Sequence, residues 1–403
     1  MEHVGSDDNV AATECLIFAC FGDDGSDDDD DRTTAVRAFS SSAMEARDAA
    51  DVSKSRELRN ASNANRPTPL GPIIDNSRFV VFDTATAVGS SGFSGDGGGG
   101  GGGLGLRATR AYMTGQEILR EVAVMRIPNT QSASCRSEAV RLHNDAVLRA
   151  YNLLHDDTRS AFMDLSSSCE DDEADDDDDD DVDDMAKRKT PRGIYDTNSF
   201  RLGPHESNGG VFLTIARMNH SCRPNVNHYW RSNLQMTIVY ACRDIHVGEE
   251  LCTIYGPSEW MDTLGRRTFL NERFHFTCNC EMCTEGNIAG GDERMEQIRV
   301  LQEDIALSSS LLITPTATTT TTDASSSKLE DINKCLSLMT QQGIGGGAFT
   351  KSIYHRGYAI CIAAGDIKLA RTYLQSEYIA VRNSEGVDSP NALEIECVLN
   401  LSE

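Results

Sequence analysis

The spacing of hydrophobic positions changes along this chain and separates a strand-rich middle from a helical end. Short apolar runs at Arg78–Phe82 and Gln235–Cys242 predict β-strands. Between them, apolar side chains recur near helical spacing over residues 136–165, which predicts a helical insert of two helices, the second capped by Asp157. Beyond Glu285 the spacing is helical again, so we expect an α-helical region over residues 286–403.

Local signals divide that helical end into several helices. Ser352–Ala364 and Ile367–Asn383 are expected to form an αα-hairpin, with Asp366 as the N-cap of its second helix. A further helix is expected from Pro390. We interpret the Thr- and Ser-rich stretch Thr314–Ser327 as a linker between two earlier helices.

The strand-rich middle contains a short internal repeat. Residues 110–118 parallel residues 243–251, and each copy reads as a strand, a turn and a second strand. Gly115 and Gly248 occupy the turns, where glycine supplies the positive φ that the backbone needs. We interpret Glu249 and Glu250 as the solvated edge of the second turn rather than as an acid–base pair.

Composition adds that part of the chain does not pack. The formal net charge of the 403 residues is −26 and only 39% of them are hydrophobic. We expect disorder in the acidic tail 1–75 and in the loop 166–192, where Glu170–Asp184 is acidic at all but two positions. The glycine run Gly97–Gly103 is not followed by GKS or GKT, which excludes a P-loop and favours a simple-sequence loop.

Charge and hydropathy also limit the partners and the compartment. The acidic balance argues against direct binding to nucleic acid or anionic membranes and favours basic protein partners. No run of 18 apolar residues predicts a membrane span, and the N-terminus lacks the basic region of a secretory signal. We therefore expect an intracellular protein, nuclear or cytoplasmic. The basic triplet Lys187–Lys189 is weak evidence for nuclear import.

Three closely spaced cysteines, Cys278, Cys280 and Cys283, predict a metal site. In a reducing compartment, thiolates at this spacing bind zinc, which takes four tetrahedral ligands. We favour Cys222 as the fourth ligand because it lies beside a polar turn. Water, His275 or another cysteine remain alternatives. A site of four thiolates leaves no open position, so the metal would be structural.

Three motifs, found in order between Asn219 and Cys283, together resemble a known family. They are the run NHSCRPN at 219–225, the run GEEL at 248–251 followed by Tyr255, and the CxCxxC of the cysteines. They resemble the SET-domain protein lysine methyltransferases, most closely the branch of SET-and-MYND and fungal SET proteins. The resemblance covers Arg78–Cys283. The insert has only Cys135 and Cys169, so no MYND finger is expected.

The resemblance implies a fold and an arrangement of domains. The SET domain would span residues 76–256, with small curved sheets, a knot-like crossing and the helical insert. A zinc-bound post-SET segment would follow at 257–285. The α-helical tail 286–403 resembles the tetratricopeptide-like tails of the same family, although two good 34-residue periods are not found.

The resemblance also implies an activity, the transfer of a methyl group from S-adenosylmethionine to a lysine of a histone or another protein. By matching motifs, the resemblance implies that Tyr255 is the catalytic tyrosine and that Phe274 helps to form the lysine channel, with Tyr240 as a further candidate to face it. Residues implied to contact the methyl donor are Gly103, Leu104, Gly105, Asn198, Asn219, His220, Tyr255 and Phe276. For Asn198 the alternative is a structural turn cap, and for Tyr240 it is a place in the core.

Two other functions remain open at this stage. One is a catalytically silent SET module that binds partners through its helical tail and acidic loops. The other is a zinc-folded or redox adaptor. Leu104, which stands where relatives have polar or basic side chains, favours the silent module slightly. The presence of Tyr255, Asn219 and His220 favours the enzyme.

Overall fold

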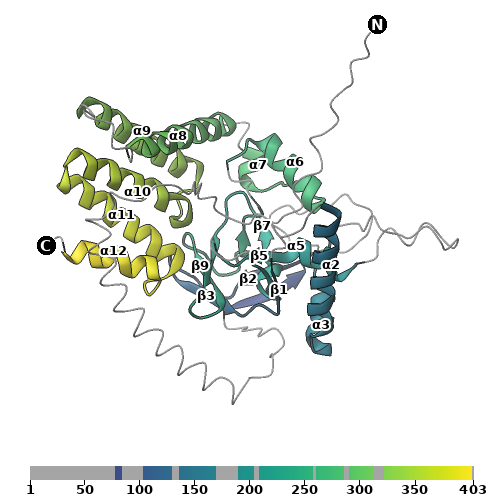
Figure 1. Ribbon diagram of the computed structural model, residues 1–403. Coiled ribbons are helices and arrows are strands. Elements are labelled where there is room, and N and C mark those ends of the chain that lie inside the picture. Colours follow the sequence, from purple (N-terminus) through teal and green to yellow (C-terminus); the bar gives the residue numbers. More distant parts are fainter. Residues whose placement is uncertain are drawn as a thin grey trace, which may run out of the picture. The chain divides into compact units, whose positions relative to one another are not determined.

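The computed structural model describes residues 78–83, 103–128, 136–168, 189–203, 208–256, 260–285, 290–312 and 322–401 (Figure 1). All of them belong to one unit of the chain. The predicted disordered tail 1–75 and the acidic run Glu170–Asp184 lie outside the described residues, as does the basic pair Lys187-Arg188. Within the described residues, no helix combines the length and the apolar character that crossing a membrane requires.

Among the described residues, four small sheets form the middle of the chain. Three are antiparallel: β1 (Phe79–Asp83) pairs with β2 (Leu104–Ala108), β9 (Met236–Ala241) lies between β3 (Glu117–Glu121) and β8 (Val226–Arg231), and β6 (Asn208–Val211) lies between β4 (Met125–Pro128) and β5 (Ser199–Arg201). The fourth is a short parallel pair of β7 (Asn219–His220) and β10 (Cys252–Thr253). This parallel pair joins the NHSCRPN run to the segment that leads into Tyr255.

The helical insert is confirmed as helices α2 (Arg136–Asn152) and α3 (Asp156–Met163), and α5 (Pro191–Asn198) follows them. Phe162 and Ile194 are fully buried in a small core shared with strands β4 and β6. The prediction that Asp157 caps the second helix is wrong. His155 stands at the N-cap and makes no side-chain cap, whereas Asp157 lies in the first turn, where its charge suits the helix dipole.

Each copy of the internal repeat forms a strand, a turn and a second strand, and the two copies pair with each other around a local twofold relation. Tyr112 and Ile245, which are equivalent positions, exchange backbone hydrogen bonds of 2.9 and 2.8 Å. The amide of Gly115 donates to the carbonyl of Ala241, and the amide of Gly248 donates to the equivalent carbonyl of Ala108, both at 2.8 Å. Both turn glycines have φ of +82°, as predicted. Two similar sequences thus adopt one backbone and bind each other.

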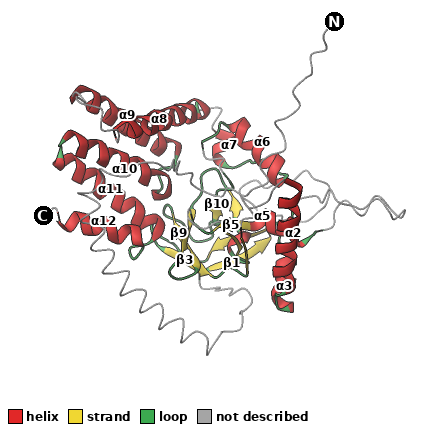
Figure 2. Ribbon diagram, viewed as in Figure 1, coloured by secondary structure: helices red, strands yellow, loops and turns green. Residues whose placement is uncertain are grey.

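Beyond residue 260 the described chain is helical (Figure 2). The helices are α6 (Thr263–Phe274), α7 (Glu281–Glu285), α8 (Gly291–Leu312), α9 (Thr322–Gln342), α10 (Gly347–Ala364), α11 (Ile367–Glu385) and α12 (Pro390–Leu401). The side chain of Asp366 accepts a hydrogen bond from the amide of Leu369, so the predicted N-cap is confirmed. The linker prediction is wrong over residues 322–327, because α9 already begins at Thr322. The likeness of the tail to tetratricopeptide repeats stays a prediction.

The tail helices share a core with the segment that carries the cysteines. One cluster of buried side chains contains Cys222 and Phe276 together with Met295, Ile332 and Phe349 from α8, α9 and α10. The predicted boundary at residue 286 therefore crosses a continuous core. Burial of these apolar side chains removes them from water, which is the main force holding the tail to the cysteine segment.

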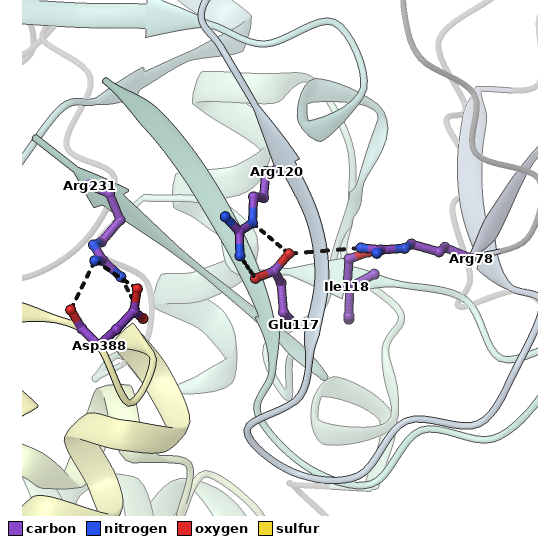
Figure 3. A network of polar contacts seen from close by, with 6 residues as sticks. All are labelled: Arg78, Glu117, Ile118, Arg120, Arg231 and Asp388. Atoms are coloured by element: carbon purple, nitrogen blue, oxygen red, sulfur yellow. Dashed lines mark hydrogen bonds and ion pairs between the residues drawn. The ribbon is translucent and has the colours of Figure 1, made fainter. Parts of the chain in front are cut away.

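The turn between α11 and α12 also contacts the strands. Arg231 on β8 is only 2% exposed, and its guanidinium binds the carboxylate of Asp388 at 3.0 Å (Figure 3). Nearby on β3, Glu117 accepts two hydrogen bonds from Arg120, of 2.7 and 2.6 Å, and faces Arg78 (Figure 3). Because Arg231 is buried, its pairing with Asp388 matters more than an exposed ion pair would.

Candidate functional site

The four cysteines of the predicted metal site lie together. Their sulfur atoms all fall within 4.8 Å of one another, and the Cys222 sulfur is 3.6 Å from that of Cys283 and 3.8 Å from that of Cys278. A tetrahedral zinc ion with bonds of about 2.3 Å needs sulfurs about 3.8 Å apart. All four side chains are buried. The arrangement therefore fits a metal ion with four thiolate ligands.

Local backbone geometry brings the cysteines together. Helix α6 ends at His275, whose φ of +56° reverses the chain direction. A turn closed by the Cys283 amide on the Cys280 carbonyl, at 2.9 Å, then brings the last three sulfurs to one side. Cys222 comes from the loop directly after β7, 56 residues earlier than Cys278. Of the alternatives for the fourth ligand, the structure places Cys222, and not His275, in the group.

Thiols at this separation share protons when no cation balances them. Hydrogen bonding to Cys278 raises the pKa of Cys222, whereas hydrogen bonding from Cys222 lowers the pKa of Cys280. The guanidinium of Arg266 supplies one positive charge to the cluster. Its side chain is fully buried and donates to the Cys283 sulfur at 3.8 Å. Four ionised thiolates still require a divalent cation.

His220 links the cysteine cluster to Tyr255. The Tyr255 amide donates to His220 Nδ1 at 3.0 Å, so a neutral imidazole carries its proton on Nε2. That Nε2 lies 3.2 Å from the Cys222 sulfur, which it can reach as a donor. Burial lowers the pKa of His220 to about 4, so the ring is neutral near pH 7. One ring thereby fixes the distance between a metal ligand and Tyr255.

Aromatic rings surround the Tyr255 side chain. Its ring centroid lies 5.0 Å from that of Phe274, 6.4 Å from that of Phe276 and 5.3 Å from that of His220. The hydroxyl donates to the carbonyl of Met218 at 2.7 Å. Burial raises the pKa of Tyr255, so it stays a neutral phenol. The group offers an apolar wall with one oriented hydroxyl.

Asn219, beside this group, is held between β2 and the turn that carries Glu250. Its side-chain Nδ2 donates to the Glu250 carboxylate at 2.8 Å. A Cβ atom added to Gly105 would lie 2.9 Å from Asn219 Nδ2 and 3.0 Å from Glu250 Oε1. Only glycine therefore lets β2 approach this pair so closely. Residues 103–105 and Asn219, which are all predicted to contact the methyl donor, therefore lie against each other. The side chain of Leu104 is exposed.

Comparisons with known proteins agree with this arrangement. The model of the family described as SET domain matches residues 103–256. Residues 103–256 of this chain are a SET domain. The chain is 29% identical over 211 residues to the Schizosaccharomyces pombe protein named histone-lysine N-methyltransferase set5, covering 50% of this chain and 62% of that one. It is 39% identical over 103 residues to the Drosophila melanogaster SET domain-containing protein SmydA-8, isoform A, covering 24% of this chain and 22% of that one.

A third SET relative is the N-lysine methyltransferase SMYD2 of Sus scrofa, 39% identical over 74 residues, covering 18% of this chain and 16% of that one. In all three comparisons the chain spans less than two thirds of the relative's length. The comparisons therefore identify a SET domain at residues 103–256, whereas the activity of the whole protein has to be argued from its site.

Two predicted site residues of the SET domain are not brought into the aromatic group. Tyr240 points to the tail: a Cβ atom at Gly386 would lie 2.4 Å from its hydroxyl oxygen. This placement matches the alternative of a core position. Asn198 donates from Nδ2 to the carbonyls of Ser166 and Ile194, both at 2.7 Å. Those bonds hold the end of α5 in place, which matches the alternative of a structural cap.

The sequence reasoning missed several residues of the site. Asn225, the last residue of NHSCRPN, is 2% exposed; its side chain accepts from the Cys252 amide at 2.8 Å and donates to the Glu250 carbonyl at 2.7 Å. Glu249 and Glu250, interpreted as the solvated edge of a turn, are half-buried, and both carboxylates accept side-chain amide hydrogen bonds. The available signal was the repeat of asparagine at both ends of one motif.

Proposed function

We propose that this chain is a protein-lysine N-methyltransferase that uses S-adenosylmethionine. The observation that carries the proposal is the grouping of Tyr255 with Phe274, Phe276 and His220. This group lies at one end of β7, whose Asn219 touches the Gly105 segment. A cationic donor and an aliphatic amine need these two neighbouring surfaces, one polar and one aromatic.

The reaction is an in-line displacement at the methyl carbon of a sulfonium. A lysine ammonium first releases a proton to solvent, because its free pKa is about 10.4 and only the neutral amine has a lone pair. The nitrogen then forms a bond to the methyl carbon while the carbon–sulfur bond breaks, leaving a thioether. The half-buried aromatic wall of Tyr255 and Phe274 disfavours the ammonium form and aligns the amine.

The hydroxyl of Tyr255 is suited to orient that amine. Its proton is directed at the carbonyl of Met218, 2.7 Å away. A phenol oxygen whose proton is directed at a carbonyl can accept an N–H of an amine through its lone pairs. This arrangement supports a role for Tyr255 in directing the nitrogen lone pair toward the methyl group.

The four cysteines fit a structural zinc ion, and we assign Cys222, Cys278, Cys280 and Cys283 as its ligands. When bound, zinc would supply cross-linking energy and no chemistry, since four thiolates fill its coordination shell. Cys222 follows β7, which carries Asn219, and Cys278 follows Phe274 and Phe276. The metal would thus hold together two segments that both serve the methyl transfer.

The substrate class follows from charge and from relatives. The net charge of −26 favours a basic protein segment around the target lysine. The fission yeast relative carries histone-lysine in its name. We therefore propose a lysine in a basic protein, with histone tails as first candidates in the nucleus or the cytoplasm.

The proposal is tested with the full chain, methyl-labelled donor and a panel of histones and lysine-rich proteins. Calorimetric titration measures donor binding, and mass spectrometry locates methylated lysines. Saturable donor binding and label on lysine nitrogen are expected. Donor binding without transfer to any protein in the panel or in a lysate would favour the silent module. No donor binding at all would exclude the enzyme.

A further inference from the structure

Glu250 lies just before β10 and contacts both β7 and β2 of the site. It lies one residue before Leu251, whose amide donates to the Leu106 carbonyl of β2 at 2.7 Å. Its carboxylate accepts from Asn219 on β7 and would meet a Cβ atom at Gly105 on β2. Neither the family comparison nor the motif assigns this carboxylate a role.

The chemistry of the pair fixes the orientation of an amide. An asparagine amide has a donor side and an acceptor side that a rotation exchanges. A carboxylate oxygen only accepts, so Glu250 holds Asn219 with Nδ2 inward. The carbonyl oxygen Oδ1 must then point to the opposite side. Asn219 itself is half-buried, which leaves that side within reach of a ligand.

We propose that Glu250 is a positioning residue for the methyl donor, acting by holding the Asn219 carbonyl oxygen toward the α-ammonium group of S-adenosylmethionine. This inference rests on the proposed function. An ammonium group is a pure donor and needs acceptors. An Asn219 amide turned the other way would present two N–H groups to a cation. Glu250 therefore selects the rotamer that binds the donor.

The internal repeat provides a matched control. Glu117 holds the position in the first copy that Glu250 holds in the second: it pairs across the strands with Tyr240, as Glu250 pairs with the equivalent Arg107. The Glu117 carboxylate accepts from Arg120 and faces Arg78, instead of accepting from an asparagine amide as Glu250 does (Figure 3). Glu117→Gln thus makes the same chemical change in the same backbone setting.

The test compares Glu250→Gln with Glu117→Gln in the full chain. Glutamine keeps the size of glutamate but can donate or accept, so it no longer selects one amide orientation. We expect the affinity for S-adenosylmethionine to fall about tenfold, as for one lost hydrogen bond to a charged group. The kcat at saturating donor should stay within about threefold. Glu117→Gln should bind donor like the parent.

A double-mutant cycle with Asn219→Ala identifies the route of the effect. If Glu250 acts through the amide, Glu250→Gln should weaken donor binding little further once Asn219 is alanine. Additive losses, or a Glu250→Gln variant that binds donor normally, would overturn the inference. Glu250→Asp, which keeps a pure acceptor, should recover part of the affinity. Absence of donor binding in the parent would instead count against the proposed function.

Discussion

The carboxyl group of Glu121 gives this protein a stability that depends on pH near neutrality. Glu121 ends β3, and its oxygens accept from the amides of Thr214 and Ile215 at 2.8 to 3.1 Å, at the start of the short 3-10 turn Ile215–Arg217. Burial raises the pKa of Glu121 from 4.5 to about 7, and hydrogen bonds from Thr214 and Ile215 oppose that rise only in part.

The sign of the effect follows from proton linkage. The folded protein holds this proton up to about pH 7, whereas the unfolded chain releases it near pH 4.5. The contribution to stability is therefore fully present below pH 4.5 and is lost as pH rises to 7 and beyond. The difference of about 2.5 in pKa corresponds to about 3 kcal/mol in the free energy of unfolding.

Glu121→Gln removes this titration while keeping an amide oxygen for the same N–H groups. The assay is chemical denaturation of parent and variant between pH 4.5 and 8.5 at constant ionic strength. The stability of the parent relative to the variant should fall by about 3 kcal/mol across that range. Loss of metal at low pH affects both proteins, so it cancels in the difference. Glu117→Gln, the same charge change in the same strand, controls for net charge.

A difference between parent and Glu121→Gln that stays constant with pH would refute the reasoning. It would mean that water or a local rearrangement solvates the carboxyl group in the folded state. The consequence reaches the site, because the turn held by Glu121 leads directly to Met218, whose carbonyl accepts from the Tyr255 hydroxyl.

Three further predictions concern single side chains. Tyr255→Phe should lower methyl transfer by about 10²-fold or more, as for loss of a positioned hydroxyl, while donor affinity measured by calorimetry stays near that of the parent; equal turnover would mean that Tyr255 does not orient the amine. Cys280→Ser should abolish the zinc detected by metal analysis and weaken donor binding with it, whereas Cys397→Ser should change neither; a metal-free variant with normal donor affinity would show that the cluster is remote from the site. Asp388→Ala should lower the free energy of unfolding by about 1–2 kcal/mol, because it leaves the buried Arg231 guanidinium without its carboxylate; Asp388→Asn should recover part of the loss, and no change in stability would show that water replaces the pair.

Features that depend on residues close together in the sequence could mostly be predicted. The spacing of Cys278, Cys280 and Cys283 indicated a metal site because thiolates so close together have few other uses. Helical spacing and the Gly365–Asp366 turn predicted α10 and α11, since capping and burial act over short distances. Ser352 was nevertheless too late a start for α10, which begins at Gly347. Gly347 has few helix-forming properties, and its place is set by close packing against Ala380.

Long-range contacts were not predictable in the same way. Asn225 and Glu250 looked like polar residues of a loop and a turn, and their importance arises only when β7 and β10 pair side by side. The pattern around Tyr240 predicted a strand correctly. Which face of that strand contacts the tail could not be predicted, because it depends on where the tail docks. Thr322–Ser327 has low intrinsic helix propensity, so a sequence of Ser and Thr gave no sign that a helix of 21 residues includes it.

The two copies of the internal repeat share one backbone conformation, but their turns have different surroundings. At Gly115, in the first copy, an added Cβ atom would lie 2.6 Å from Asn383 of α11, whereas at Gly248, in the second copy, it would meet nothing within 4 Å. The turn of the first copy therefore packs against the tail. The turn of the second copy is open, and Glu250, which follows it, contacts Asn219. In this repeat, the turn of one copy contacts the tail and the residues after the turn of the other copy contact the proposed methyl-donor site. A side chain added at Gly248 should therefore leave the docking of the tail unchanged, whereas a side chain added at Gly115 would displace Asn383.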